Sequence, residues 1–252
     1  MPTLLRDVTS AVWSDGKFVA KVHDDLGEAD REQLLVTRFC SAGCRVAEPL
    51  GVEQVAGTRG GVSWWAWVDI EGPVAPCEAV GWLRMAHDTV PTQAAPSARW
   101  LPFDRAVHPD AVELHNALAP WRRRARETHE QLAGLPRVMI HGDANPTNIV
   151  RSGGGVLGLD FGAAGTGPRV VDVATVAVLA TETGTSSPSE IVAAYDAHQD
   201  VSPMVLRAAE LMVAVARAQA CTWVPWLNEG WGRIAALDGS RPYVFGSGGH
   251  PK

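Results

Sequence analysis

The chain has 252 residues, a length that fits one large domain or two small lobes and suffices for a hydrophobic core. Apolar residues make up 46% of the chain and charged residues 20%, a composition that excludes a disordered protein. The formal net charge of -6 argues against a nucleic-acid-binding protein, because a phosphate backbone requires a basic face, whereas it suits a cationic small substrate.

The first 71 residues are predicted to form a small β-rich unit with one helix. Asp15-Gly16 separates two β-rich runs, which is a strong signal for a hairpin. Asp30 is the expected N-cap of the helix that follows, and Gly43 suits the position just after its end. In chain order we predict strands over 8–13 and 17–22, a helix over 31–42, and strands over 46–55 and 62–70.

The chain changes character at residue 72 and is predicted to be mainly helical beyond it. In chain order we predict a helix over 78–88, a proline-rich loop over 91–103, a long helix over 110–133, short strands over 137–140, 148–150 and 156–159, and helices over 170–182, 188–198 and 203–222. A small β-rich lobe over residues 1–71 therefore precedes a larger helical lobe over residues 72–252.

The cysteines and the apolar stretches favour a cytoplasmic protein that lies outside membranes. Cys40 and Cys44 lie one helical turn apart, but no second pair or nearby histidine completes a zinc site, so we expect reduced, mostly packed thiols. The longest apolar stretch, 170–180, is interrupted by Asp172 and is too short to span a bilayer. The N-terminal residues show no signal-peptide pattern, so we expect a cytoplasmic location, with neither a membrane nor a nucleic acid as a partner.

The stretch HGDANPTNIVRSGGGVLGLDFG, residues 141–162, contains two patterns that are both relevant to phosphate chemistry. Gly153, Gly155 and Gly158 match G-x-G-x-x-G, which binds phosphates when it follows a strand and opens a helix. Here the glycines separate two short apolar runs, and neither Lys-Ser nor Lys-Thr follows them. We therefore predict that they form a hairpin turn, where positive φ angles favour glycine.

Three polar residues in the same stretch predict a site for phosphoryl transfer. Asp143 and Asn148 have the spacing of the Asp and Asn in a protein-kinase catalytic loop, and Asp160 begins an Asp-Phe-Gly sequence. The reaction requires a carboxylate near the attacking hydroxyl, oxygen ligands for Mg²⁺ and a cation at the phosphates. We expect the three side chains to converge at the ends of neighbouring strands.

HGDANPTNIV followed by VLGLDFG resembles the aminoglycoside phosphotransferase and choline kinase family, which consists of small-molecule kinases. Further segments that resemble the family are FVAKVH (18–23), DREQLLVTRF (30–39), WVDIEGP (67–73), WLRMAHDTVP (82–91) and GPRVVDVATV (167–176). The resemblance implies an α+β, bilobal protein-kinase-like fold with a small β-rich N-lobe (1–71) and a larger, mainly helical C-lobe (72–252).

The resemblance also implies roles for the residues that match the catalytic loop and the segment after it. Asp143 would orient the acceptor hydroxyl and take its proton, and Asn148 and Asp160 would bind Mg²⁺. Asp172 would tether the catalytic loop through backbone hydrogen bonds. His141 is expected to be a structural hydrogen-bonding residue.

The nucleotide site is implied by the same resemblance and lies mainly in the N-lobe. Lys21 would contact the phosphates of ATP or GTP and pair with Glu32, for which Glu28 is the alternative partner. Backbone groups of Val68 and Ile70 would hydrogen-bond the purine. Thr9 and Ser10 would contribute their hydroxyls and backbone amides to the loop that covers the phosphates.

The expected reaction is transfer of the γ-phosphate of ATP or GTP to a hydroxyl of a small molecule, first of all an aminoglycoside or another antibiotic. Choline-like amino alcohols and sugars are alternative acceptors, and a catalytically weak nucleotide-binding regulatory relative is the alternative outside the enzymes. Trp223, Trp226 and Trp231 lie in the last helical region, where members of the family bind the acceptor. Their faces could attract an ammonium group, and core packing is the alternative role.

Overall fold

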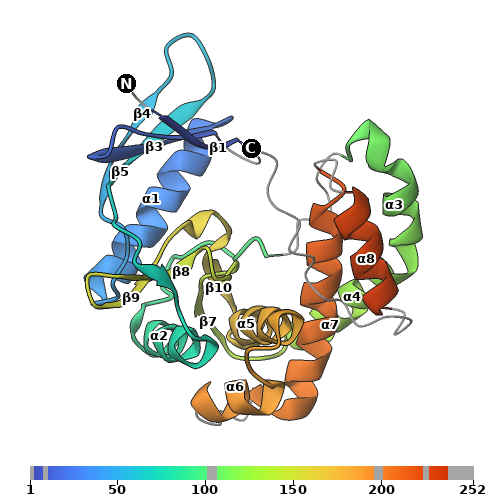
Figure 1. The fold of residues 1–252 in the computed structure, drawn as a ribbon. Coiled ribbons are helices and arrows are strands. Elements are labelled where there is room, and N and C mark those ends of the chain that lie inside the picture. Colours follow the sequence, from blue (N-terminus) through green and yellow to red (C-terminus); the bar gives the residue numbers. More distant parts are fainter. Residues whose placement is uncertain (1–2, 8–10, 101–106, 196–200, 224–226, 238–252) are drawn as a thin grey trace.

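The structure is a computed structural model and describes residues 3–7, 11–100, 107–195, 201–223 and 227–237. A small lobe, which consists of an antiparallel sheet and helix α1, lies beside a larger lobe that is mainly helical (Figure 1). This arrangement confirms the predicted α+β, bilobal fold. Within the described residues, no helix combines the length and the apolar character needed to cross a membrane.

The N-lobe sheet has the strand order β1-β2-β3-β5-β4, with all neighbouring strands antiparallel. Its elements are β1 (Thr3–Asp7), β2 (Ala11–Ser14), β3 (Phe18–His23), α1 (Leu26–Ser41), β4 (Pro49–Gln54) and β5 (Gly61–Ala66). The predicted hairpin at Asp15-Gly16 is confirmed, because β2 pairs with β3 and Gly16 has a φ of 85°. Gly43 follows α1 with a φ of 84°, as expected of a glycine just beyond a helix end.

Several N-lobe boundaries differ from the prediction. Strand β1 was not predicted, whereas residues 11–13 of the predicted strand 8–13 lie in β2 and residues 8–10 lie outside the described residues. Helix α1 begins at Leu26, because the N-cap is Asp25 and its side chain accepts a hydrogen bond from the amide of Gly27 at 2.8 Å. Strand β5 ends at Ala66, which leaves residues 67–71 without regular structure.

The C-lobe combines helices with two small sheets. Its strands are β6 (Gly72–Pro73), β7 (Arg137–Ile140), β8 (Ile149–Ser152), β9 (Gly155–Gly158) and β10 (Gly165–Pro168). Its helices are α2 (Pro76–Thr89), η1 (Pro109–Ala111), α3 (Val112–Ala117), α4 (Ala119–Leu132), η2 (Phe161–Ala163), α5 (Val170–Thr183), α6 (Pro188–Tyr195), α7 (Pro203–Ala220) and α8 (Leu227–Leu237). Strands β6, β8 and β9 form one sheet, and β7 pairs with β10 in the other.

Several features of the C-lobe differ from the prediction, among them strands β6 and β10, which were not predicted. The helix predicted over 110–133 is divided at Leu118 into α3 and α4, because Pro120 has no N–H and its ring excludes the carbonyl of the preceding turn. Helix α8 was not predicted, since Gly230 and Gly232 lower its helix propensity. It packs on α7 and α3, and this tertiary burial stabilises it.

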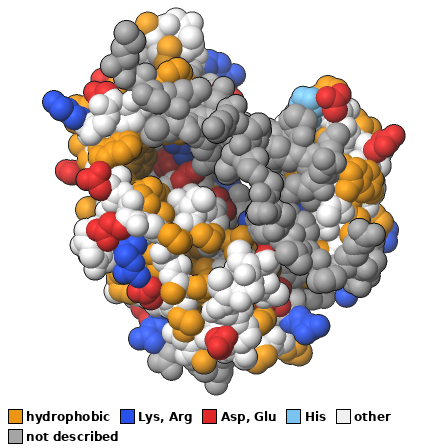
Figure 2. Space-filling model, in the orientation of Figure 1, with side chains coloured by type: hydrophobic (Ala, Val, Ile, Leu, Met, Phe, Trp, Pro, Cys, Tyr) orange, Lys and Arg blue, Asp and Glu red, His pale blue; other side chains and the backbone are white. Residues whose placement is uncertain are grey.

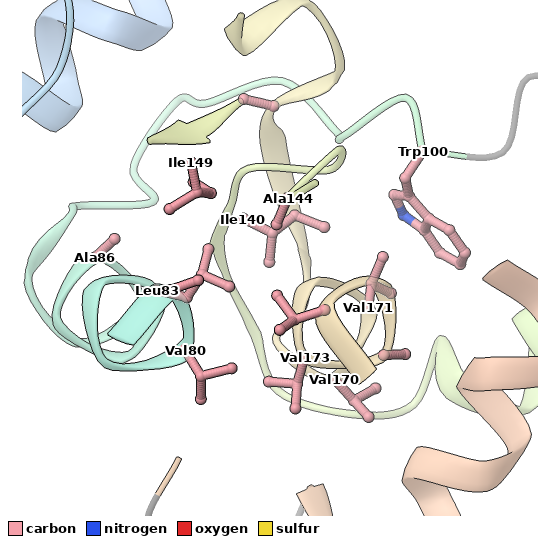
Figure 3. Packing of buried hydrophobic residues seen from close by; sticks show 14 of the residues in the cluster. Val80, Leu83, Ala86, Trp100, Ile140, Ala144, Ile149, Val170, Val171 and Val173 are labelled. Atoms are coloured by element: carbon pink, nitrogen blue, oxygen red, sulfur yellow. The ribbon is translucent and has the colours of Figure 1, made fainter. Parts of the chain in front are cut away.

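The core of the C-lobe holds the strands that lead to the catalytic sequence. Figure 3 shows Ile140, the last residue of β7, with Leu83 of α2 on one side and Val171 of α5 on the other, and these residues belong to one core cluster. These side chains are essentially inaccessible to solvent. Because close-packed side chains resist displacement, this core fixes the position at which the chain leaves β7.

The glycines of the G-x-G-x-x-G sequence lie in the hairpin between β8 and β9. Gly153 and Gly154 form the turn that connects the two strands, and their φ angles are 52° and 72°. Gly158 ends β9, and a Cβ atom there would lie 2.7 Å from the ring of Trp82. The prediction of a turn is confirmed, because a conformational and a steric requirement account for these glycines.

Asp172 anchors the chain just after β7 to α5. Its carboxylate accepts hydrogen bonds from the amides of His141 at 2.7 Å and Gly142 at 2.8 Å. Nε2 of His87, on α2, lies 3.0 Å from the same carboxylate. Nδ1 of His87 lies 2.6 Å from the hydroxyl of Tyr195, on α6. The expected tether is therefore present, and it joins three helices to the catalytic loop.

Asp172 is completely buried, so its ionisation depends on these partners. Burial alone raises the pKa of the carboxyl, but the hydrogen bond and charge of His87, together with the charge and backbone amide of His141, outweigh it and hold the pKa below its ordinary value of 3.8. A depressed pKa in the folded state contributes stability that is present above pH 3.8 and is lost as the pH falls through the folded value.

Asp172→Asn is expected to lower the free energy of unfolding by about 3 kcal/mol at pH 7, because the amide that replaces the carboxylate leaves buried N–H groups poorly paired. Urea denaturation followed by tryptophan fluorescence measures this difference. The difference between wild type and variant should be largest above about pH 5 and should narrow as the pH falls toward 3.

Asp88→Asn is the matched control, because the Asp88 carboxylate is 44% exposed and pairs with Arg169 at 3.2 Å. Loss of this exposed ion pair should lower the free energy of unfolding by less than about 1 kcal/mol. Equal effects of the two variants would contradict the anchoring role of Asp172.

Candidate active site

The catalytic loop, residues 141–148, begins where β7 ends and leads into β8. Gly142 has a φ of 81°, and a Cβ atom there would lie 2.5 Å from the carbonyl oxygen of Ala163. A larger residue would therefore strain the backbone and collide with η2. His141 is buried and contacts the carbonyl of Leu159 at 2.8 Å, the structural role that was expected.

Asp143 and Asn148 are in direct contact. The Asn148 amide nitrogen donates to the backbone carbonyl and to Oδ2 of Asp143, both at 3.0 Å. Asn145 donates to Oδ1 of Asp143 at 3.0 Å, which the sequence did not indicate. Since both carboxylate oxygens accept from an amide, the orientation of Asp143 is fixed before any ligand binds.

The pairing of β8 with β9 bonds Asn148 to Leu159, the residue just before Asp160. The register sets Ile149 opposite Gly158, and the amide of Leu159 donates to the carbonyl of Asn148 at 2.7 Å. Asp160 itself has a φ of 55° and a ψ of 74°, in the left-handed region. Such backbone strain persists only where surrounding contacts enforce it, and it is common at functional sites.

Lys21 joins the N-lobe sheet to α1 and to Asp160. Its Nζ donates to the carboxylate of Glu32 at 2.8 and 3.0 Å and to Oδ1 of Asp160 at 2.8 Å. The side chains of Lys21 and Glu32 are 13% and 2% exposed, whereas that of Asp160 is 30% exposed. The structure thus pairs Lys21 with Glu32; the alternative, Glu28, pairs instead with Arg99 at 3.0 Å.

Burial and charge oppose one another in this cluster. Burial lowers the pKa of the Lys21 ammonium, but the charges of Glu32 and Asp160 outweigh it and raise the pKa above its ordinary value. Burial raises the pKa of the Glu32 carboxyl above its ordinary value, although the charge of Lys21 acts in the opposite direction. Lys21 is therefore cationic near neutral pH.

A buried polar group behind Glu32 was missed in the sequence. His23, two residues beyond Lys21 on the same face of β3, has its Nε2 2.9 Å from the hydroxyl of Ser63 and 3.7 Å from Glu32. Trp65 donates to the same hydroxyl at 3.0 Å. The alternation of β3 predicts the shared face, but the partner on β5 depends on sheet pairing that no local pattern shows.

The segment between the lobes has backbone groups that lack hydrogen bonds to the described residues, at the positions predicted to contact a purine. The backbone amide of Trp67 donates to the carbonyl of Lys17 at 3.0 Å, and the backbone amide of Glu71 donates to the carbonyl of Arg151 at 2.8 Å. Between them, the backbone groups of residues 68–70 make no hydrogen bond to the described part of the chain. These residues include Val68 and Ile70, whereas Thr9 and Ser10 lie outside the described residues.

Five of the predicted site residues are thus brought together in two linked groups. Lys21 contacts both Glu32 and Asp160, and Asp143 contacts Asn148, while a backbone bond connects Asn148 to the residue before Asp160. On the face drawn in Figure 2, the surface is hollowed between the two lobes, and charged side chains lie within the hollow. Among the described residues, no group of three His, Cys, Asp or Glu side chains forms a metal site.

Of the three C-terminal tryptophans, Trp231 on α8 is 43% exposed, Trp223 is partly buried, and Trp226 is not among the described residues. An exposed ring on α8 is compatible with an acceptor contact. The partial burial of Trp223 is compatible with packing.

Comparison with known proteins bears on this arrangement. The sequence matches the phosphotransferase enzyme family over residues 7–211, and no curated protein matches it significantly. Amicoumacin kinase hAmiN shares the fold with a TM-score of 0.72 at 13% identity, over 97% of this chain and 90% of that chain. The aminoglycoside phosphotransferase APH(3'')-Id from Streptomyces rimosus ATCC10970 is 20% identical with a TM-score of 0.62, over 85% and 92% of the two chains. Choline kinase LicA from Streptococcus pneumoniae is 12% identical with a TM-score of 0.64, over 96% of this chain and 94% of that chain.

These solved structures establish a shared fold, and the family match extends across both lobes. The site lies inside the matched region, from Lys21 to Asp160. The chain belongs to the phosphotransferase enzyme family.

Proposed function

We propose that this chain transfers the γ-phosphate of ATP or GTP to a hydroxyl of a small molecule, with the nucleotide bound between an N-lobe of residues 1–71 and a C-lobe of residues 72–252. The observation that carries the proposal is a set of linked contacts. Lys21 binds Asp160, the amide of Leu159, the residue before Asp160, binds the carbonyl of Asn148, and Asn148 binds Asp143. A phosphate-binding cation, oxygen ligands for a metal and a carboxylate base thus lie in the order that phosphoryl transfer requires.

The side chains of Asn148 and Asp160 fit a divalent cation with oxygen ligands. The amide nitrogen of Asn148 is held by Asp143, and this leaves Oδ1 with one contact among the described residues, at 3.4 Å from the Thr147 hydroxyl. The Asp160 carboxylate is partly exposed. Mg²⁺ prefers one or two protein oxygen ligands together with the oxygens of a phosphate, and when bound it would neutralise charge on the transferring group.

Asp143 is the proposed base. Its carboxylate is held by Asn145 and Asn148, so it can orient an acceptor hydroxyl and accept its proton as the phosphate is transferred. Lys21 would release Asp160 in part and bind the nucleotide phosphates, while Glu32 keeps the ammonium in place. Positioning and charge neutralisation supply the rate enhancement, and no covalent intermediate on the protein is required.

The backbone groups of residues 68–70, which make no hydrogen bond to the described residues, support a purine site in which Val68 and Ile70 hydrogen-bond the base. From the sequence alone, we propose that the hydroxyls and backbone amides of Thr9 and Ser10 contact the phosphates in the loop that covers them. A backbone segment offers both N–H donors and C=O acceptors, which can pair with either adenine or guanine, so either ATP or GTP could be the donor.

An aminated antibiotic is the acceptor that we propose first. Solved structures of similar fold are described as complexes with streptomycin or hygromycin B, and another as a choline kinase. The net charge of -6 and the exposed ring of Trp231 support a cationic acceptor. We propose a role in antibiotic resistance within the cytoplasm, which the free state of all four cysteines supports. Choline-like amino alcohols and sugars are the second group of acceptors.

A panel of aminoglycosides, other hydroxylated antibiotics, choline and sugars, each supplied with ATP or GTP and Mg²⁺, is expected to reveal phosphorylation of an aminated member. Product mass, increased by one phosphate group, is the measurement. Nucleotide binding without transfer to any member would instead favour a regulatory relative that has lost catalysis.

Asp143→Asn is expected to lower kcat by about a hundredfold or more, because the amide cannot accept the proton, whereas nucleotide affinity should remain close to that of the wild type. Steady-state kinetics and nucleotide titration measure the two effects. Glu130→Gln makes the same chemical change on an exposed face of α4 and should leave kcat unchanged. Undiminished turnover in Asp143→Asn would exclude Asp143 as the base.

A further inference from the structure

We propose that Arg31 is a positioning residue that couples α1 to the metal-binding turn, residues 160–164, and thereby sets how tightly the site binds Mg²⁺ with nucleotide. The Mg²⁺ part of this inference rests on the function proposed above; the coupling of α1 to the turn does not. Arg31 touches none of the proposed reacting groups. Its neighbour Glu32 holds Lys21 from the same turn of the helix.

The guanidinium of Arg31 binds one backbone carbonyl within η2 and one just after it. Nη1 donates to the carbonyl of Gly162 at 2.8 Å, and Nη2 donates to the carbonyl of Ala164. Nη2 also lies 3.2 Å from the carbonyl of Ser97. One side chain of the N-lobe thus connects three backbone positions of the C-lobe.

Neighbouring contacts restrict the same turn from other directions. The carbonyl of Ala163, between the two bound by Arg31, accepts the amide of Arg99 at 2.9 Å. It also faces Gly142 so closely that a Cβ atom there would lie 2.5 Å from it. The turn is therefore enclosed by α1, by the segment that contains Arg99 and by the catalytic loop.

The strain at Asp160 explains why the turn needs such contacts. A left-handed backbone at a non-glycine residue relaxes unless its surroundings enforce it. Arg31 supplies charge-assisted bonds from a planar fork, which fixes two carbonyls in one geometry; a lysine ammonium could not reproduce this arrangement. The geometry of the Asp160 carboxylate, and hence the affinity for a metal, depends on that enforcement.

The test compares Arg31→Gln and Arg31→Lys with Arg38→Gln as the control. Arg38 lies on the same helix and donates to the carbonyl of Gln93 at 2.7 Å, away from the metal-binding turn. Hydrogen exchange of peptides that cover residues 160–166 is measured without ligands. The free Mg²⁺ concentration that gives half-maximal binding of AMP-PNP is measured on the same proteins.

Arg31→Gln is expected to speed exchange in residues 160–166 and to raise the half-maximal Mg²⁺ concentration about tenfold, whereas Arg38→Gln changes neither. Arg31→Lys should lie between the two. Exchange that is unaltered in Arg31→Gln, or faster exchange with the Mg²⁺ concentration unchanged, would overturn the inference.

The two proposals fail in different ways. If the wild type binds no AMP-PNP at any Mg²⁺ concentration, the proposed function fails, and with it the role of Arg31 in metal affinity. The exchange data on the ligand-free proteins then still decide whether Arg31 holds the turn.

Discussion

The ion pair between Lys21 and Glu32, extended to Asp160, is the interaction on which the two lobes depend. Lys21 and Glu32 are almost entirely buried, and separating buried partners leaves an uncompensated charge in a medium of low polarity. The pair therefore fixes α1 against β3, and the contact with Asp160 carries this constraint into the C-lobe. Because the same ammonium is the cation proposed to bind phosphates, the requirement for stability and the requirement for catalysis fall on one group.

The catalytic loop is held by contacts of a different kind. Asp172 accepts two successive backbone amides at the exit of β7, and the buried core around Ile140 fixes the strand that precedes them. The Asn148 carbonyl then binds the amide that precedes Asp160, so loop and metal-binding turn share a backbone connection. Positioning of this kind is what phosphoryl transfer demands, since the protein contributes orientation and charge and forms no covalent intermediate.

The features that could be predicted from the sequence are those with local signals. The Asp15-Gly16 hairpin and the turn of the 141–162 stretch depend on a few adjacent residues. The break between α3 and α4 was missed because apolar periodicity continues past Pro120, and α8 was missed because its stability comes from packing. The bond from Arg31 to Gly162 joins positions 131 residues apart, so only the folded chain brings them together.

The most direct test of this account is a thermal-shift titration of wild type and Asp160→Ala with ATP and with GTP, each with and without Mg²⁺. The account predicts a rise in Tm in the wild type that requires Mg²⁺, since binding to the folded state alone stabilises it, and loss of the Mg²⁺-dependent part in Asp160→Ala. No rise with either nucleotide, or an equal Mg²⁺-dependent rise in both proteins, would contradict a metal-assisted nucleotide site at Asp160.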